Sequence, residues 1–274
     1  MKNLIKISLT AFAILFLTTV GFAQSEEELA KAAQNPVANI YSFPLQNNTV
    51  FGVGPYSRTQ NILNIQPVIP IPLGSKINMI NRIVMPIITQ PSFTEDVSST
   101  GLGDFVYTAW LSPSKPSKII WGLGPVFQFG TASDSIYGSG EFGIGPSLVV
   151  LSMPGDFVLG AVVNNIRTFG DKEENKFFLN YFVNYNFPKW YLVSAPIVTA
   201  NWNADKDQRW VVPFGGGLGK VFKLGGKLPV NVNAHVYYNA VKPDGVGDWQ
   251  TRFQLVFMFP TKSMKEKMKA ANQN

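Results

Sequence analysis

The chain of 274 residues contains no cysteine and only one histidine, His235. The absence of cysteine excludes disulfide bonds and thiolate metal sites, and a single imidazole excludes a metal site built from several histidines. Charged residues make up 15% of the chain, against roughly 25% in a typical soluble domain. Most of the net charge of +6 lies at the two chain ends, so the central part lacks the basic surface of a nucleic-acid binder. We therefore expect no metal, no cofactor and no nucleic-acid partner.

Long apolar runs are also absent beyond the first residues, where none reaches the roughly 18 residues of a transmembrane helix. The N-terminus itself has a basic stretch, "MKNLIK", an apolar stretch, "ISLTAFAILFLTTV", and small residues in "GFA". This order predicts a signal peptide over residues 1–23, cleaved before Gln24. An uncleaved membrane anchor is the less favoured alternative, because the apolar run is short for a spanning helix. The mature protein is expected to be exported across a bacterial inner membrane.

Residues 24–48 differ in pattern from the rest of the mature chain. "SEEELAKAAQ" predicts a short helix, and "NPVANIYSFPLQNN" reads as an extended polar connector. We predict a periplasmic N-terminal segment over 24–48 and regard it as a candidate plug.

From residue 49 to residue 260, apolar and polar residues alternate with a period of two, which is the pattern of half-buried strands. "KFFLNYFVNYNF", "VNVNAHVYYN" and "TRFQLVFMF" are the clearest examples. About twelve strands are predicted, near 49–57, 61–72, 76–89, 102–112, 118–130, 140–152, 157–169, 176–187, 190–202, 209–222, 228–241 and 248–259. Most exceed the usual length of about 5–6 residues in soluble sheets and suffice for the roughly 9–11 of a membrane strand.

Short turns alternate with longer polar loops between these strands, and aromatic residues gather at strand ends. Together with a signal peptide, these features predict an all-β fold, a transmembrane antiparallel up-and-down β-barrel in the Gram-negative outer membrane. Lipid offers no hydrogen-bond partners, so a sheet spans it only when closed. A secreted β-sandwich or jelly roll is the soluble alternative. Expected partners are outer-membrane lipid and, through the terminal strand Gln250–Phe259, the barrel-assembly machinery; a basic tail follows at 261–274.

Several prolines fall inside the predicted strands, where proline removes a donor from the hydrogen-bond ladder. They predict bulges or bends and are the main evidence against the predicted register. These prolines are Pro67, Pro70, Pro72, Pro86, Pro125, Pro146, Pro196 and Pro213.

The glycine-rich stretch "VPFGGGLGKVFKLGGK", residues 212–227, invites comparison with a phosphate-binding loop. A Walker A loop with the pair Gly219-Lys220 would need glycine at 214 and a hydroxyl at 221, where the chain has Phe214 and Val221. We interpret the stretch as a barrel strand with a glycine stripe facing the lumen. The stripe leaves room for a bulky neighbour or allows sharp coiling, and it suggests open volume or a place for an inward-folded N-terminal segment.

Candidate site residues are therefore those predicted to face the lumen. They comprise inward charges, interpreted as ion pairs that fill the interior or as a selectivity ring, the glycine stripe, and a polar seam on the last two strands. The candidates are Arg82, Asp104, Glu141, Gly215, Gly217, Gly219, Asn231, Asn233, His235, Tyr237, Arg252 and Gln254. No nucleophile motif accompanies His235, which is interpreted as a polar lumen residue, and no enzyme activity is expected.

Several stretches also resemble a known family, and the resemblance covers roughly residues 29–260. They include "NILNIQPVIPIPL", "GLGDFVYTAWLSP", "WGLGPVFQFGTASD", "TANWNADKDQRWVVPFGGGLGKVFKLG" and "VYYNAVKPDGVGDWQTRFQLVFMFP". The family consists of bacterial outer-membrane proteins usually called transporters, some under a mistaken neuromedin-U label, and it is similar to the barrels named after the MetA pathway of phenol degradation. The resemblance implies a barrel and passage of small molecules, and it brings no catalytic residues.

The expected function is thus an outer-membrane channel for passive uptake of small apolar or aromatic solutes. The alternative is a non-conducting structural or ligand-binding barrel, filled by its own side chains or by the N-terminal segment, since twelve strands lie between filled and open barrels. A barrel hydrolase using His235 is the third hypothesis.

Overall fold

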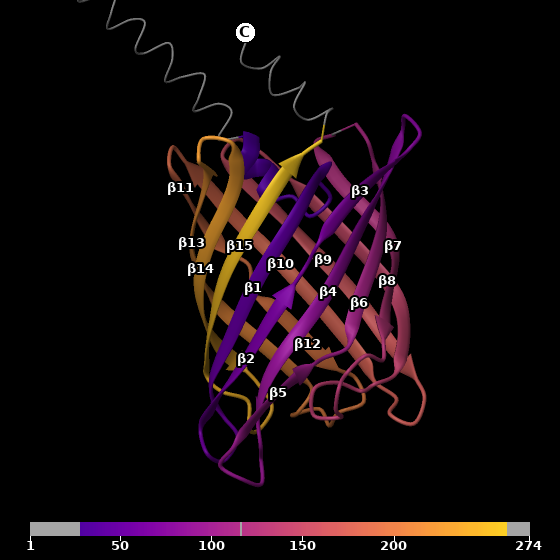
Figure 1. The fold of residues 1–274 in the computed structure, drawn as a ribbon, viewed down its shortest axis with the longest axis vertical. Helices are drawn as coiled ribbons and strands as arrows, with labels where there is room; N and C mark the ends of the chain where they lie inside the picture. Colours follow the sequence, from indigo (N-terminus) through magenta and orange to yellow (C-terminus); the bar gives the residue numbers. More distant parts are fainter. Residues whose placement is uncertain (1–27, 116, 262–274) are drawn as a thin grey trace, which may run out of the picture.

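A computed structural model describes residues 28–115 and 117–261, so the predicted signal peptide and most of the basic tail lie outside the described residues. Within the described part, no helix is both long and apolar enough to cross a membrane. The fold is an all-β, closed antiparallel barrel of 12 strands with one short helix at the N-terminus (Figure 1). The predicted fold class is therefore confirmed.

The barrel wall contains fifteen strand segments, because three of the twelve positions are occupied by two consecutive segments each. These interrupted positions are β2 with β3, β5 with β6, and β11 with β12. The segments are β1 (Ile40–Val53), β2 (Arg58–Ile65), β3 (Val68–Leu73), β4 (Ile77–Pro91), β5 (Ser98–Leu102), β6 (Phe105–Pro113), β7 (Ile119–Phe129), β8 (Phe142–Ser152), β9 (Phe157–Phe169), β10 (Asn175–Phe187), β11 (Trp190–Ser194), β12 (Ile197–Asn201), β13 (Trp210–Leu224), β14 (Leu228–Val241) and β15 (Trp249–Pro260).

The sheet closes by pairing its first and last strands. β1 and β15 run antiparallel from the pair Ile40 and Pro260 to the pair Phe51 and Trp249. Because this pairing continues the ladder around the wall, neither terminal strand leaves a free edge.

β1 begins at Ile40, nine residues before the predicted start at residue 49. The prediction that all of 24–48 lies before the barrel is therefore wrong, and the barrel spans 40–260. The alternation was already present in residues 40–48: Tyr41 and Phe43 are exposed, whereas Pro44 and Gln46 are buried. Because its inward residues are polar and it contains a proline, this strand has the sequence pattern of an extended connector.

Three strand prolines coincide with local interruptions of the ladder, as predicted. Pro67 separates β2 from β3, Pro196 separates β11 from β12, and Pro213 follows a register shift in β13. Freed backbone groups find other partners: the Gln66 amide donates to the Pro44 carbonyl at 2.9 Å. These three prolines therefore mark breaks in the strands, whereas Pro70 and Pro72 lie within an uninterrupted pairing of β3 with β4.

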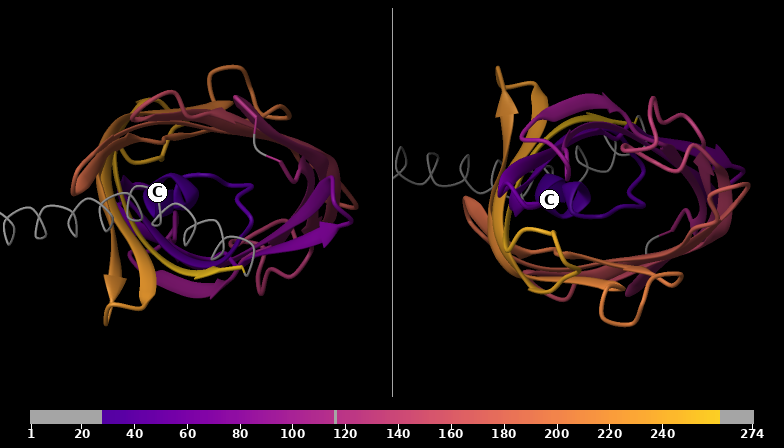
Figure 2. Two further views of the ribbon diagram at one scale, coloured as in Figure 1. Left: turned by 90° about the horizontal axis from the view of Figure 1, so that it is seen from above. Right: turned by 90° about the horizontal axis from the view of Figure 1, so that it is seen from below.

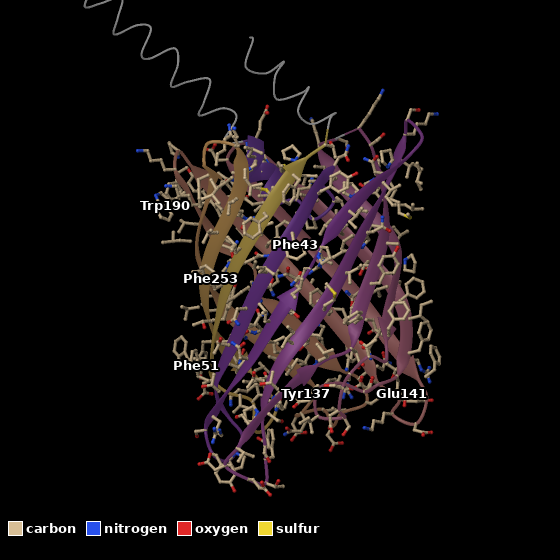
Figure 3. The ribbon with its side chains drawn as sticks, viewed as in Figure 1. Phe43, Phe51, Tyr137, Glu141, Trp190 and Phe253 are labelled. Carbon is tan, nitrogen blue, oxygen red and sulfur yellow. The ribbon has the colours of Figure 1, made fainter. Side chains whose placement is uncertain are left out.

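Apolar side chains cover the outside of the barrel. Phe253 on β15 is 51% exposed and Phe43 on the adjacent β1 is 39% exposed. Aromatic residues also lie toward both ends of the wall, Trp190 near the end that holds the chain termini and Phe51 near the opposite end (Figure 3). A belt of exposed apolar residues between two aromatic girdles is the surface of a barrel that contacts lipid.

The two barrel ends differ in their connections. β1 starts and β15 finishes at one end, here called the terminal end, which also carries short turns such as 188–189 and 225–227 (Figure 1). The longer loops 130–141, 202–209 and 242–248 lie at the opposite, loop end. This arrangement confirms the predicted alternation of short and long connections.

The N-terminal segment, defined as residues 28–39, lies inside the barrel at the terminal end and begins with a helix over residues 28–33 (Figure 2). Leu29 is fully buried in a cluster with Ile40, Tyr191 and Met258. Gln34 donates from Nε2 to Asn186 Oδ1 on β10 at 2.8 Å. The segment is therefore anchored to the wall by both apolar and polar contacts.

The outward face predicts a strong asymmetry between neighbouring positions on β15. Leu255→Arg places a charge on the apolar outer face and should cost about 2–4 kcal/mol of folding free energy in lipid. Gln254→Arg should cost much less, because Gln254 faces the lumen and lines a cavity. Urea titrations in liposomes measure both, and equal losses would show that the two faces are wrongly assigned.

Candidate functional site: the barrel lumen

The polar seam predicted on β14 faces the lumen. Asn231, Asn233, His235, Tyr237 and Asn239 are all buried, whereas the alternate residues from Ala234 to Tyr238 are exposed. The seam follows from strand geometry, because side chains two residues apart lie on the same face.

His235 lies at the centre of this seam with both ring nitrogens occupied. Tyr237 Oη is 2.6 Å from His235 Nδ1, and His235 Nε2 is 2.7 Å from Asn233 Oδ1. Tyr237 Oη also accepts the Ala195 amide at 3.3 Å. Asn233 Oδ1 can only accept, so Nε2 carries the ring proton, and in the neutral ring Nδ1 accepts from the Tyr237 hydroxyl. His235 is then a neutral imidazole that donates from Nε2 to Asn233. This ring is fixed between an amide and a phenol; the hydrolase hypothesis stays untested.

Tyr191, which the sequence analysis did not single out, joins this network from β11. Its hydroxyl donates to Asn231 Oδ1 at 2.7 Å and accepts from Asn233 Nδ2 at 3.2 Å. Asn233 Nδ2 also donates to Gln254 Oε1 at 3.2 Å. A tyrosine that pairs across strands distant in sequence leaves no short-range signal, so only the folded barrel shows it.

Arg252 and Arg82 both face the lumen, as predicted, and neither forms an ion pair among the residues that the structure describes. Arg252 is 5% exposed. It donates from Nε to Asn48 Oδ1 at 2.9 Å and from Nη1 to the Ala195 carbonyl at 2.7 Å. Arg82 donates from Nη2 to Gln66 Oε1. Both guanidinium groups are therefore held by neutral oxygens.

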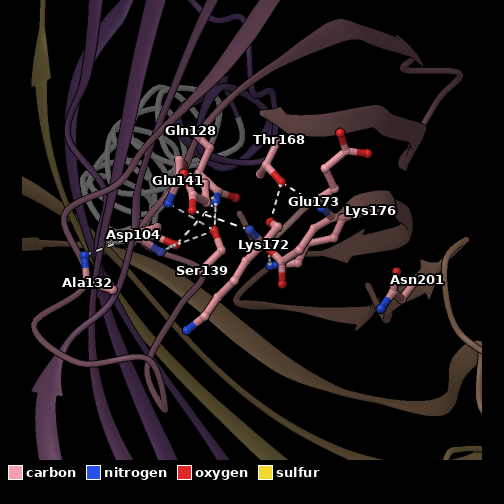
Figure 4. Close-up of polar contacts among 12 residues, drawn as sticks. Asp104, Gln128, Ala132, Ser139, Glu141, Thr168, Lys172, Glu173, Lys176 and Asn201 are labelled. Carbon is pink, nitrogen blue, oxygen red and sulfur yellow. Dashed lines mark hydrogen bonds and ion pairs between the residues drawn. The ribbon is translucent and has the colours of Figure 1, made fainter. Parts of the chain in front are cut away.

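Asp104 and Glu141 lie at the loop end and do not pair with these arginines, so the expected pairing of inward charges is wrong (Figure 4). Asp104 Oδ1 accepts the backbone amides of Thr131 and Ala132 at 3.1 and 3.0 Å. Glu141 Oε1 accepts the Lys172 amide at 3.4 Å. These carboxylates fix the backbone of loops at the loop end of the barrel. The break between β5 and β6 places Asp104 outside a regular strand.

The glycine stripe on β13 faces inward but does not border open volume, contrary to the expectation. A Cβ on Gly217 would lie 1.8 Å from the Ala234 carbonyl oxygen, and one on Gly215 would lie 2.1 Å from the Val236 carbonyl oxygen. At Gly219 the space is filled by the ring of Tyr191. The stripe therefore allows β13 and β14 to approach closely and receives a bulky neighbour, which was one of the two predicted uses.

Two cavities occupy the lumen. The narrow cavity, about 180 Å³, lies against the N-terminal segment and is lined by Arg82, Arg252 and the polar seam. The wide cavity, about 600 Å³, extends toward the loop end. Its surface is mainly apolar, with Val84, Phe178 and Ile197 on its wall, although more than half of its lining residues are polar. Four residues line both: Gln46, Gln66, Arg82 and Asn180.

Among the described residues, no cluster of three or more histidine, cysteine or acidic side chains is placed to hold a metal ion. The hydrogen-bond donors in the lumen include amides, phenols, hydroxyls, an imidazole, an ammonium group and guanidinium groups. Gln46 and Asn48 were missed because they were assigned to the N-terminal segment, although their spacing with Pro44 follows the strand alternation.

No family model and no curated protein matches this chain. Among solved structures, the chain is similar to the COG4313 outer membrane channel from Pseudomonas putida F1. The TM-score is 0.60 at 14% sequence identity, with 80% of this chain and 94% of that chain covered. At this identity the likeness shows the fold, and it agrees with the predicted barrel. The resemblance to a named transporter family stays a prediction.

Two further structures are more distant. The outer membrane phospholipase A from Escherichia coli matches with a TM-score of 0.39 at 11% identity, covering 80% of this chain and 95% of that chain. The P. putida toluene transporter TodX matches with a TM-score of 0.39 at 9% identity, covering 83% and 92%. Likenesses this weak support no conclusion about the present chain.

The buried network makes Tyr191 sensitive to loss of its hydroxyl. Tyr191→Phe should destabilise the barrel by about 1–3 kcal/mol, because it removes the donor to the buried Asn231 Oδ1 and one of the two acceptors of Asn233 Nδ2. The matched change Tyr185→Phe, on the exposed face of β10, should have little effect. Urea unfolding followed by tryptophan fluorescence compares them, and a similar loss in both variants would contradict the network.

Proposed function

We propose that the protein is an outer-membrane channel of a Gram-negative bacterium that admits small solutes with apolar or aromatic bodies by passive diffusion. The observation that carries the proposal is a wide cavity of about 600 Å³ with a largely apolar surface inside a closed barrel. The apolar outer surface supports the membrane location, since only a closed sheet satisfies its backbone in lipid. Recognition by the barrel-assembly machinery through Gln250–Phe259 stays part of this proposal.

The lining of the wide cavity supports the proposed class of solute. Val106, Ile166 and Val211 come from three separate parts of the wall and present apolar surface to the cavity, and Phe178 adds an aromatic ring. An apolar solute gains free energy by leaving water for such a surface, at about 25 cal/mol per Å² of apolar area buried. Eight amide side chains, including Asn164 and Asn180, supply polar contacts among them.

A non-conducting barrel remains the second candidate because of one observation, the N-terminal segment inside the terminal end. Ala33, Asn35 and Pro36 of this segment line the narrow cavity. The segment therefore stands between the cavities and the space beyond the terminal end. We propose that it narrows the channel without sealing it.

Planar-bilayer recordings test the channel and separate the two candidates. Deletion of residues 24–38 removes the segment and leaves β1 intact, so single-channel conductance should rise above that of the mature protein. Leu29→Ala should change conductance in the same direction, because it removes a fully buried anchor whose loss costs about 2–5 kcal/mol.

The matched control is Leu73→Ala at the same barrel end, where the leucine is 48% exposed on the outside and should leave conductance unchanged. An absence of current from both the mature protein and the deletion would contradict the channel and favour the structural barrel. A hydrolase assay with His235→Ala addresses the third hypothesis separately.

A further inference from the structure

Arg252 is buried and Arg82 half-buried in the lumen, and neither has a carboxylate partner among the described residues, although Arg252 lies over the Tyr237 ring at 5.3 Å. A guanidinium group carries a permanent charge and five N–H donors, and taking it out of water is costly unless it is paired and hydrogen-bonded. Arg252 uses two of its nitrogens on Asn48 and Ala195, and Arg82 has one bond, to Gln66. Each arginine therefore retains N–H donors that the described residues do not satisfy.

The described residues that line the two cavities carry positive charge and no negative charge. Among the described residues that line them, the cationic side chains are Arg82, Arg252, Lys176 and Arg209, and none is an aspartate or glutamate. Of these four, only Lys176 has a carboxylate partner, Glu174. A cavity lining with fixed positive charges attracts anions. The carboxylates of Asp104 and Asp244 lie behind this lining and accept hydrogen bonds from Gln128 and Gln208.

Arg209, at the loop end of the wide cavity, is a further arginine with an N–H donor that has no acceptor among the described residues. It donates from Nη2 to the Ala204 carbonyl at 3.1 Å and lies over the Trp202 ring at 5.7 Å. Its Nε is buried and has no acceptor among the described residues. Unsatisfied guanidinium donors thus occur both at the loop end of the lumen and deeper within it.

Arg82 occupies the position where this charge meets the apolar surface. It lines the narrow cavity together with Arg252, and it also lines the wide cavity together with Phe178 and Ile197. A ligand with an anionic group at Arg82 can therefore place its remaining atoms against the apolar wall. The planar fork of an arginine matches a carboxylate better than a monatomic ion, since two parallel N–H···O bonds can form.

We propose that the lumen contains a binding site for small carboxylates with an apolar or aromatic body. The carboxylate binds at Arg82 within the cavity that Arg252 also lines, and the apolar body lies in the wide cavity. Gln46 and Gln66, which line both cavities beside Arg82, complete the polar part of the site. This inference rests on the proposed function and narrows its solutes to organic anions.

The direct test compares three probes of nearly equal size and different charge. Benzoate, benzyl alcohol and benzylamine are titrated by calorimetry into the detergent-solubilised mature protein at constant ionic strength. Benzoate should bind at least about tenfold more tightly than the neutral alcohol, the value of one charge-assisted contact. Benzylamine should bind most weakly, because its ammonium group meets only like charges.

Two variants locate the site. Arg82→Gln and Arg252→Gln should each weaken benzoate about tenfold or more and leave benzyl alcohol within about threefold. Arg167→Gln is the matched control, because Arg167 is exposed and pairs with Glu173 away from both cavities. Its benzoate affinity should equal that of the unaltered protein. Thermal melting checks that each variant is folded. If a variant is unfolded, the comparison of the three probes on the unaltered protein still tests the carboxylate site.

Failure of this inference and failure of the channel give different results. Equal affinities for benzoate and benzyl alcohol, or no binding of any probe by a protein that conducts in bilayers, would overturn the carboxylate site and leave the channel intact. Loss of benzoate affinity in Arg167→Gln equal to that in Arg82→Gln would also overturn it. The absence of both binding and conductance would remove the proposed function itself.

Discussion

The closure of the sheet is the constraint on which the other features of this molecule depend. Backbone groups in lipid have no water to bind, so each must be paired within the protein. The antiparallel pairing of β1 with β15 completes that pairing around the wall. Backbone groups at the breaks still find partners, as when the Gly103 amide donates to the Pro86 carbonyl at 3.0 Å beside the break between β5 and β6. The outside is then free to be apolar, because no polar backbone remains to be covered.

Closure also turns polar side chains into the lumen, where they need hydrogen-bond partners. Every strand turns alternate side chains inward, and those of β14 are amides, an imidazole and a phenol that bind one another in a continuous network. A satisfied network of this kind is stable in a partly dry interior. The arginines differ, because neutral oxygens occupy only part of their donors. The seam residues therefore bind one another and stabilise the interior, whereas the arginines keep N–H donors that are available to a solute.

Much of the wall could be predicted from the sequence, because period-two alternation is a local signal. The inward seam from Asn231 to Asn239 and the outward residues Phe253 and Phe259 followed from it directly. The start of β1 did not, since Pro44 and the polar residues Gln46 and Asn48 hide the alternation. Asp104 was misplaced for a related reason: a break in the strand destroys the parity by which inward and outward residues are counted.

The remaining features of the lumen depend on contacts between distant segments. The ring of Tyr191 fills the space beside Gly219, and the local sequence around either residue does not predict this contact. Likewise, the unpaired state of Arg82 and Arg252 follows from where the carboxylates lie, and Asp104 and Glu141 are bound to loop amides. Burial and partner choice of this kind are properties of the closed barrel, which strand patterns alone do not contain.

If the barrel conducts through a lumen whose lining is positively charged, its ion selectivity should show it. In a planar bilayer with a KCl gradient, potassium and chloride have similar mobility, so the reversal potential reflects the lumen. We expect the mature protein to give a reversal potential shifted toward the chloride equilibrium potential, because the fixed charges of Arg82 and Arg252 favour anions. A shift toward the potassium equilibrium potential would show that these arginines do not set the selectivity.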